Sequence, residues 1–196
     1  MSTTLILASQ SPRRKELLTQ LGYNFQCLPA GIDESIQSDE NATQYVARLA
    51  LEKANAIAQN QADGDVVVLG SDTCVVFQQH ILGKPESLDD CIAILKMLSD
   101  NSHQVVTAIA AVQGERSEVI VVTTDVDFKA LSTQEITRYW QTGEPQDKAG
   151  AYGIQGIAGQ FVKQIRGSYS SVVGLPLYET AQLLSSFGVK SLIAQD

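Results

Sequence analysis

The stretch that decides the fold is residues 5–18, which read LILASQSPRRKELL. An apolar run, a short polar segment and a second run with paired leucines predict a β-strand, a loop and an α-helix. Ser11 is suited to cap this helix, because its hydroxyl can accept a hydrogen bond from a free backbone N–H, and Pro12 suits the first helical position. We therefore expect a strand–loop–helix unit over these residues.

Two arginines stand at the start of the predicted helix. A helix N-terminus has free N–H groups and a partial positive charge, and the guanidinium groups of Arg13 and Arg14 match phosphate oxygens. In a chain with a net charge of -8, this segment is where an anion is expected to bind. Taken alone, the same residues are equally consistent with an ordinary capped helix whose arginines are solvated.

Composition and charge restrict the class of protein. The 196 residues fit one domain over 1–196, long enough to bury a large core. An excess of 22 acidic over 14 basic residues disfavours nucleic acid and anionic membrane surfaces as partners. No apolar run approaches the roughly 20 residues that span a bilayer, and residues 1–4 lack the charged region of a signal peptide. Three cysteines without CxxC spacing are typical of reduced thiols, so we expect a cytoplasmic protein.

Helical and strand patterns alternate along the chain, and no Pro/Gly/Ser-rich linker divides it. Helices are expected over 12–21, 42–59, the stretches capped by Ser87 and Ser132, and 175–187. Strands are expected over 5–7, 25–28, 66–77, 105–112, 119–128 and 161–165. The predicted fold class is α/β: a single domain with a central mixed β-sheet flanked by helices, with two lobes around an active-site cleft.

The second informative stretch is GSDT at residues 70–73. Asp72 stands at or just beyond the end of an apolar strand pattern. Since a buried carboxylate needs a partner, this one either lies exposed at the sheet edge or takes part in metal or acid–base chemistry. Ligands of open α/β sheets gather at the carboxyl ends of the strands. A turn-forming aspartate is the less favoured interpretation.

Two further charged features fall in candidate positions. Asp33 and Glu34 lie in a polar loop after the second predicted strand, and they can supply a second carboxylate. Lys53 interrupts the apolar stripe of a predicted helix, which is formed by residues 46, 49, 50, 54 and 57. A lysine on that stripe needs a path to solvent or an anionic partner. Taken singly, both features are also consistent with solvated charges.

Lys84 and the segment 147–156 complete the set. Lys84 precedes a proline after a predicted hairpin. Residues 147–156, DKAGAYGIQG, combine glycines that permit close backbone approach with Gln155, whose amide both donates and accepts as base recognition requires. Together these features offer cations for a polyphosphate, carboxylates for a metal and a water, and an amide for a base.

In combination these motifs resemble the Maf family of nucleoside triphosphate pyrophosphatases. They run in order over nearly the whole chain: LASQSPRR at 7–14, DE at 33–34, LEKA at 51–54, GSDT at 70–73, GKP at 83–85, KAGAYGIQG at 148–156 and VGLP at 173–176. The resemblance implies hydrolysis of a nucleoside triphosphate to monophosphate and pyrophosphate, and it implies a homodimer. Arg13, Thr73 and Gln155 resemble the branch that acts on dTTP and UTP, rather than the branch that acts on 7-methyl-GTP.

The expected roles follow from the resemblance and from the chemistry of each side chain. A divalent cation, Mg²⁺ or Mn²⁺, is expected on Glu34 and Asp72, because the substrate is a polyanion. Asp72 is the expected general base. Thr73 and Gln155 are expected to contact the pyrimidine. Phosphate charge is expected to be offset by Arg13, Arg14, Lys53 and Lys84, and Ser9 is expected to add a neutral hydrogen-bond donor. Glu34, Lys53 and Lys84 are expected to be catalytic together with Asp72.

Two alternatives remain open at this point. One is a nucleotide-binding regulator of cell division or septum formation, an activity attached to the same family. Binding alone needs the cations but no general base, so the carboxylates favour the enzyme. The other is the same pyrophosphatase chemistry on 7-methyl-GTP or another modified nucleotide. Release of pyrophosphate across a panel of triphosphates separates the three.

Overall fold

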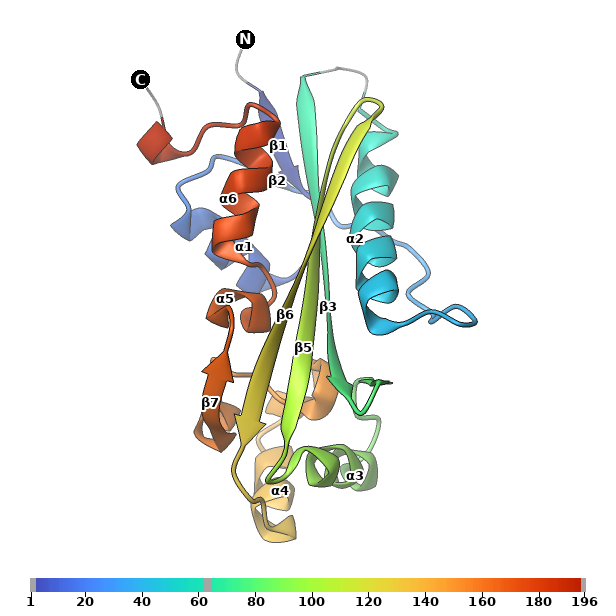
Figure 1. Ribbon diagram of the computed structural model, residues 1–196, viewed down its shortest axis with the longest axis vertical. Coiled ribbons are helices and arrows are strands. Elements are labelled where there is room, and N and C mark those ends of the chain that lie inside the picture. Colours follow the sequence, from blue (N-terminus) through green and yellow to red (C-terminus); the bar gives the residue numbers. More distant parts are fainter. Residues whose placement is uncertain (1–2, 62–64, 195–196) are drawn as a thin grey trace. The chain divides into compact units, whose positions relative to one another are not determined.

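The computed structural model describes residues 3–61 and 65–194, and its strands form one mixed sheet (Figure 1). The sheet has seven strands in the order β2-β1-β3-β5-β6-β7, with β4 paired to β3. Their bounds are Thr4–Leu7 (β1), Gln26–Cys27 (β2), Val66–Phe77 (β3), His80–Leu82 (β4), Ser102–Gln113 (β5), Arg116–Phe128 (β6) and Val162–Arg166 (β7). The predicted α/β class with a mixed sheet is confirmed. Met1 and Ser2, two of the residues on which the expectation about a signal peptide rested, lie outside the described residues.

Six α-helices occur within the described ranges. They are Pro12–Gln20 (α1), Ala42–Ala58 (α2), Leu88–Leu98 (α3), Thr133–Trp140 (α4), Tyr169–Val173 (α5) and Leu177–Ser186 (α6). Five of them match predicted helices, and α5 was not predicted. No helix in residues 3–61 and 65–194 has the length and apolar character to cross a membrane.

The described residues group into two compact units. The first unit takes in residues up to Asp72, residues 107–122 and the chain from Gly174 onward. The second takes in residues 73–106 and 123–173. Three long strands, β3, β5 and β6, contribute residues to both units.

In the first unit, β1 pairs in parallel with both β2 and β3. Leu7 at the end of β1 lies opposite Leu69 of β3, and the Ala8 N–H donates to the Leu69 carbonyl at 2.8 Å. The predicted strand over 66–77 is confirmed as β3, so the interpretation that Asp72 stands at or just beyond the end of a strand is wrong. The pairing with β1, however, stops at Leu69. Asp72 therefore lies in the interior of β3, three residues beyond the point where the pairing of β3 with β1 ends.

Helix α1 begins at Pro12 as predicted and ends at Gln20, one residue before the predicted end. The Ser11 side chain accepts from the Arg14 N–H, and Pro12 occupies the first turn. Leu17 and Leu18 are buried, but Leu21 is only partly buried, because it is the C-cap residue rather than a member of the helical face. Gly22 ends the helix with a φ of 72°, a left-handed conformation that glycine adopts without strain.

The second unit is built around aromatic side chains. Phe128 packs edge-on against His103 and against Tyr152, with ring centroids 4.8 Å apart in each pair. Phe161 extends the cluster toward Tyr139. The glycine-rich stretch after α4 forms three short 3₁₀ helices: Glu144–Asp147 (η1), Ala149–Ala151 (η2) and Ile157–Phe161 (η3). These irregular turns place Gln155 in the segment between η2 and η3.

Candidate active site in the first unit

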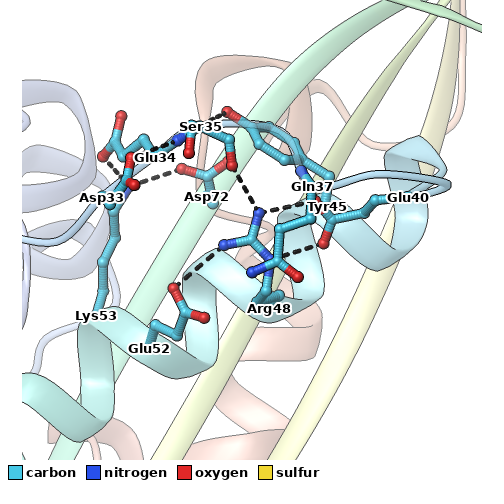
Figure 2. Close-up of polar contacts among 10 residues, drawn as sticks. All are labelled: Asp33, Glu34, Ser35, Gln37, Glu40, Tyr45, Arg48, Glu52, Lys53 and Asp72. Carbon is cyan, nitrogen blue, oxygen red and sulfur yellow. Dashed lines mark hydrogen bonds and ion pairs between the residues drawn. The ribbon is translucent and has the colours of Figure 1, made fainter.

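The centre of the candidate site is the ammonium group of Lys53, which lies between two carboxylates (Figure 2). The Lys53 residue, on α2, is only 7% exposed. Its Nζ lies 2.6 Å from Oε1 of Glu34 and 2.7 Å from Oδ1 of Asp72. The sequence predicted that this lysine has a path to solvent or an anionic partner, and the structure shows two anionic partners.

A glycine sets the distance between Lys53 and Asp72. A Cβ at Gly70 of β3 would lie 2.0 Å from the Ala50 carbonyl oxygen of α2, so no other residue fits there without movement. Lys53 is three residues beyond Ala50 on the same helical face, and Asp72 is two residues beyond Gly70 on the same face of the strand. The close approach at Gly70 thus brings the two charged groups into contact.

The Asp72 carboxyl is buried, and its surroundings pull its pKa in both directions. Burial raises the pKa, since the charged form loses its hydration. The neighbouring charges of Lys53 and Arg14 oppose that effect, but burial remains the larger cause. A carboxylate with a raised pKa is a better proton acceptor than an exposed aspartate, which suits a general base.

Arg14 is fixed by the main chain of the segment between α5 and α6. Its Nε donates to the Gly174 carbonyl at 2.9 Å, and the hydroxyl of buried Ser71 donates to the same oxygen at 3.1 Å. Burial lowers the pKa of Arg14, and the negative charge of Asp72 opposes that shift. Sequence reasoning missed the role of the Gly174 carbonyl, because a main-chain acceptor leaves no trace in side-chain type.

Ser9 and Arg13 lie at the loop between β1 and α1, where the sequence placed them. The Ser9 hydroxyl, in a residue that is 9% exposed, accepts from the Ser11 N–H at 3.1 Å. A hydroxyl that accepts one hydrogen bond still has a proton to donate, so Ser9 keeps a donor for a phosphate oxygen. Arg13 is partly buried and stands beside Arg14 at the N-terminus of α1.

The other predicted site residues belong to the second unit. Thr73 follows Asp72 on β3 and is partly buried, whereas Lys84 and Gln155 are exposed. Within the part of the chain that the structure describes, no hydrogen bond or ion pair holds the side chain of Lys84 or Gln155. Their segments are joined through the backbone, because the Gly150 N–H donates to the Gly83 carbonyl at 2.9 Å. Their roles in the site stay predictions.

Glu144 organises the segment that carries Gln155, and sequence reasoning missed it. Its carboxylate accepts from the backbone N–H of Ile157 at 2.8 Å and from the Tyr139 hydroxyl at 2.9 Å. A Cβ at Gly156 would lie 2.4 Å from Glu144 Oε2. The predicted close backbone approach is therefore present at Gly156. The approaching group is a side chain of the protein itself.

A divalent cation fits the donor set of the first unit only together with a ligand. Among residues 3–61 and 65–194, no group of three or more His, Cys, Asp and Glu side chains is arranged to hold a metal ion. Glu34 and Asp72 nevertheless direct carboxylate oxygens at one point, the Lys53 ammonium. Mg²⁺ takes oxygen ligands and is commonly held by one or two carboxylates, water and substrate phosphates. The two carboxylates meet that requirement.

Comparison with known proteins places the chain in a family. A family model described as "Maf-like protein" matches residues 4–187. A protein of Colwellia psychrerythraea named "dTTP/UTP pyrophosphatase" is 58% identical over 95% of this chain and 90% of its own length. Proteins with the same name from Vibrio parahaemolyticus and Salmonella typhimurium are 55% and 52% identical, over 95% and 94% of this chain and 98% and 93% of their own lengths. The chain therefore belongs to the Maf family.

Proposed function

We propose that this chain hydrolyses nucleoside triphosphates to a nucleoside monophosphate and pyrophosphate, with dTTP and UTP as preferred substrates. The observation that carries the proposal is the buried ammonium of Lys53 between the carboxylates of Glu34 and Asp72. The preference for dTTP and UTP is supported by the names of relatives that are 52–58% identical over nearly the whole chain.

In the proposed reaction, water cleaves the anhydride between the α- and β-phosphates. A bond forms between the water oxygen and one of these two phosphorus atoms, and the bond from that phosphorus to the bridging oxygen breaks. The leaving group takes the electron pair: it is pyrophosphate after attack at the α-phosphorus and the nucleoside monophosphate after attack at the β-phosphorus. Asp72 takes the proton from the attacking water, a role to which its raised pKa is suited. Lys53 and Arg14 offset the negative charge that shifts among the phosphate oxygens.

A divalent cation, Mg²⁺ or Mn²⁺, would be held by Glu34 and Asp72 together with the phosphates of the substrate. When bound, it would neutralise phosphate charge and polarise a phosphoryl oxygen. Ser9, Arg13 and Lys84 are proposed to bind phosphate oxygens through a hydroxyl, a guanidinium and an ammonium group.

A panel of triphosphates tests the proposed function. Wild-type protein with Mg²⁺ is offered dTTP, UTP, CTP, purine triphosphates and 7-methyl-GTP, and both pyrophosphate and monophosphate are measured. We expect dTTP and UTP to give the highest kcat/KM and equal amounts of the two products. Binding of nucleotides without any pyrophosphate would identify a nucleotide-binding regulator instead. A clear preference for 7-methyl-GTP would assign the chain to the other branch.

Base selectivity gives a sharper test at Gln155. Replacing Gln155 by Glu removes the amide donor and adds a negative charge near a polyanion, so kcat/KM for dTTP and UTP should fall by at least about tenfold relative to CTP. The matched control is Gln160→Glu, which adds the same charge at an exposed position of η3. An unchanged base preference in Gln155→Glu, or the same change in the control, would place the selectivity elsewhere.

A further inference from the structure

Glu34 lies in a segment that has no regular structure to hold it. Between the end of β2 at Cys27 and the start of α2 at Ala42, residues 28–41 form neither helix nor strand, and none of them is fully buried. The Glu34 side chain is 52% exposed. The ion pair with the buried Lys53 ammonium is half-exposed on the Glu34 side, and it holds only the end of the Glu34 side chain. The backbone of the segment is held by other contacts.

We propose that Arg48 is the residue that positions Glu34, and that it does so through the backbone of the 28–41 segment. This inference rests on the proposed catalytic role of Glu34. In Figure 2 the Arg48 guanidinium extends from α2 toward that segment. Its Nε donates to Oε1 of Glu40 and its Nη2 donates to Oε2, each at 2.7 Å, so the guanidinium binds both carboxylate oxygens. Nη2 also donates to the Ser35 carbonyl at 3.0 Å.

A second side chain of α2 holds the neighbouring peptide. The Tyr45 hydroxyl donates to the Glu34 carbonyl at 3.0 Å (Figure 2). Two consecutive carbonyls, those of Glu34 and Ser35, are thus bound by side chains three residues apart on one helical face. Lys53 comes from the same helix. The helix that carries the ammonium therefore also fixes the backbone that carries its carboxylate partner.

The guanidinium is itself held in place and neutralised. Nη1 of Arg48 donates to Glu52, one turn along α2, at 3.3 Å. The Arg48 side chain is 16% exposed and that of Glu40 only 8%. Arg48 thus has Glu40 and Glu52 as charge partners, and within residues 3–61 and 65–194 it forms no hydrogen bond with Lys53 or Asp72. Its effect on the site is one of position.

The geometry requires arginine. One planar group serves Glu40, Ser35 and Glu52 at once, whereas a lysine ammonium is a single point on a flexible stem. In Arg48→Lys the charge is kept, but the three contacts cannot all be made. Because small displacements of a catalytic group are costly, we expect kcat for dTTP to fall by about 10–100-fold, with a much smaller change in KM.

The experiment compares Arg48→Lys in two backgrounds. In the wild-type background the loss of kcat is measured as above. In a Glu34→Gln background, Arg48→Lys should change kcat less than about twofold, because the group that it positions is already lost. The matched control is Arg166→Lys, since Arg166 of β7 also binds a carboxylate, that of Asp127, at two points. The control should leave kcat unchanged.

Equal losses of kcat in both backgrounds, or no loss in either, would overturn the inference. Hydrogen exchange of residues 28–41 provides a readout that does not depend on activity: exchange should become faster in Arg48→Lys and stay unchanged in Arg166→Lys. If the wild-type chain released no pyrophosphate, the proposed function would fail, and the exchange result would still decide whether Arg48 holds this segment. Equal exchange in wild type and Arg48→Lys would contradict the inference in either case.

Discussion

Lys53 and Asp72 of the first unit are buried as a charged pair, whereas His103 and Tyr152 of the second unit are buried as neutral groups packed against aromatic rings. Lys53 and Asp72 are each 7% exposed, and they form an ion pair. His103 is 3% exposed, and its Nε2 lies 2.8 Å from the Tyr152 hydroxyl. Its Nδ1 has no hydrogen-bond partner among the described residues.

The two regions differ in whether neighbouring charges oppose the effect of burial on the pKa of the buried side chains. In the second unit burial lowers the pKa of His103 to about 4 and raises the pKa of Tyr152, so both are neutral at pH 7. In the first unit burial raises the pKa of Asp72, but Lys53 and Arg14 act against it. Neutral burial serves packing. Charged burial is costly to folding, and we infer that the first unit retains it for chemistry.

The largest expected effect comes from removing the negative charge of Asp72 in the first unit. Asp72→Asn should lower kcat by ~10²–10⁴-fold, the range for loss of a general acid–base group. Stability should change little, because Lys53 keeps Glu34 as a charge partner when the Asp72 side chain becomes neutral. The measurement is pyrophosphate release from dTTP, with thermal unfolding alongside. Asp89→Asn, at an exposed position of α3, is the control. Near-normal turnover in Asp72→Asn would remove Asp72 from the chemistry.

The next effect concerns the neutral region and its pH dependence. His103 has a lower pKa in the folded protein than its usual 6.5, so protonation favours unfolding. Its contribution to stability is complete above pH 6.5 and is lost as the pH falls to about 4. The loss is on the order of 3 kcal/mol.

The variant His103→Gln tests this contribution, since glutamine does not titrate. Denaturant unfolding between pH 7 and pH 4 should show a shallower decline in the variant than in wild type. The carboxylates titrate in both proteins, so the difference between the two curves gives the contribution of His103 to the free energy of unfolding. Parallel curves would show that His103 is not responsible.

The smallest expected effect tests the close approach of β3 to α2 at Gly70, which brings Lys53 and Asp72 into contact. Gly70→Ala places a methyl group against the Ala50 carbonyl and should lower the free energy of unfolding by about 1–3 kcal/mol. Turnover should fall as well, since α2 must move away from Asp72. Gly31→Ala is the control for stability, because no atom lies within 4 Å of its added Cβ. Equal melting temperatures for the two variants would contradict the packing argument.

Local patterns predicted most of the fold and the centre of the site. The helix caps at Ser11 and Ser132 are short-range signals, and both are confirmed. Lys53 was found because it breaks an apolar periodicity, and its need for a partner follows from the cost of burying a charge. These inferences depend on neighbours in sequence, which one chain displays directly.

Contacts between distant residues could not be predicted in the same way. Arg48 reaches back to Glu40 and Ser35, and Arg14 reaches the Gly174 carbonyl, across a separation that no periodicity encodes. The one signal for Arg48 was the spacing of Tyr45, Arg48 and Glu52 on one helical face. Asp72 was wrongly placed at the end of a strand for a related reason. The pairing of β3 with β1 ends at Leu69, but β3 itself continues to Phe77.

Gly70 has a consequence for how inactivating mutations in this chain are read. Every substitution at this position adds at least a Cβ where 2.0 Å separates it from a main-chain oxygen. A saturation screen for activity would therefore score position 70 as intolerant to all replacements, as it would Lys53 and Asp72. Yet Gly70 has no functional group to give to a substrate. In this protein, the positions where substitution abolishes activity therefore include more residues than those that take part in the reaction. Measuring the thermal stability of each inactive variant distinguishes a lost fold from a lost reactive group.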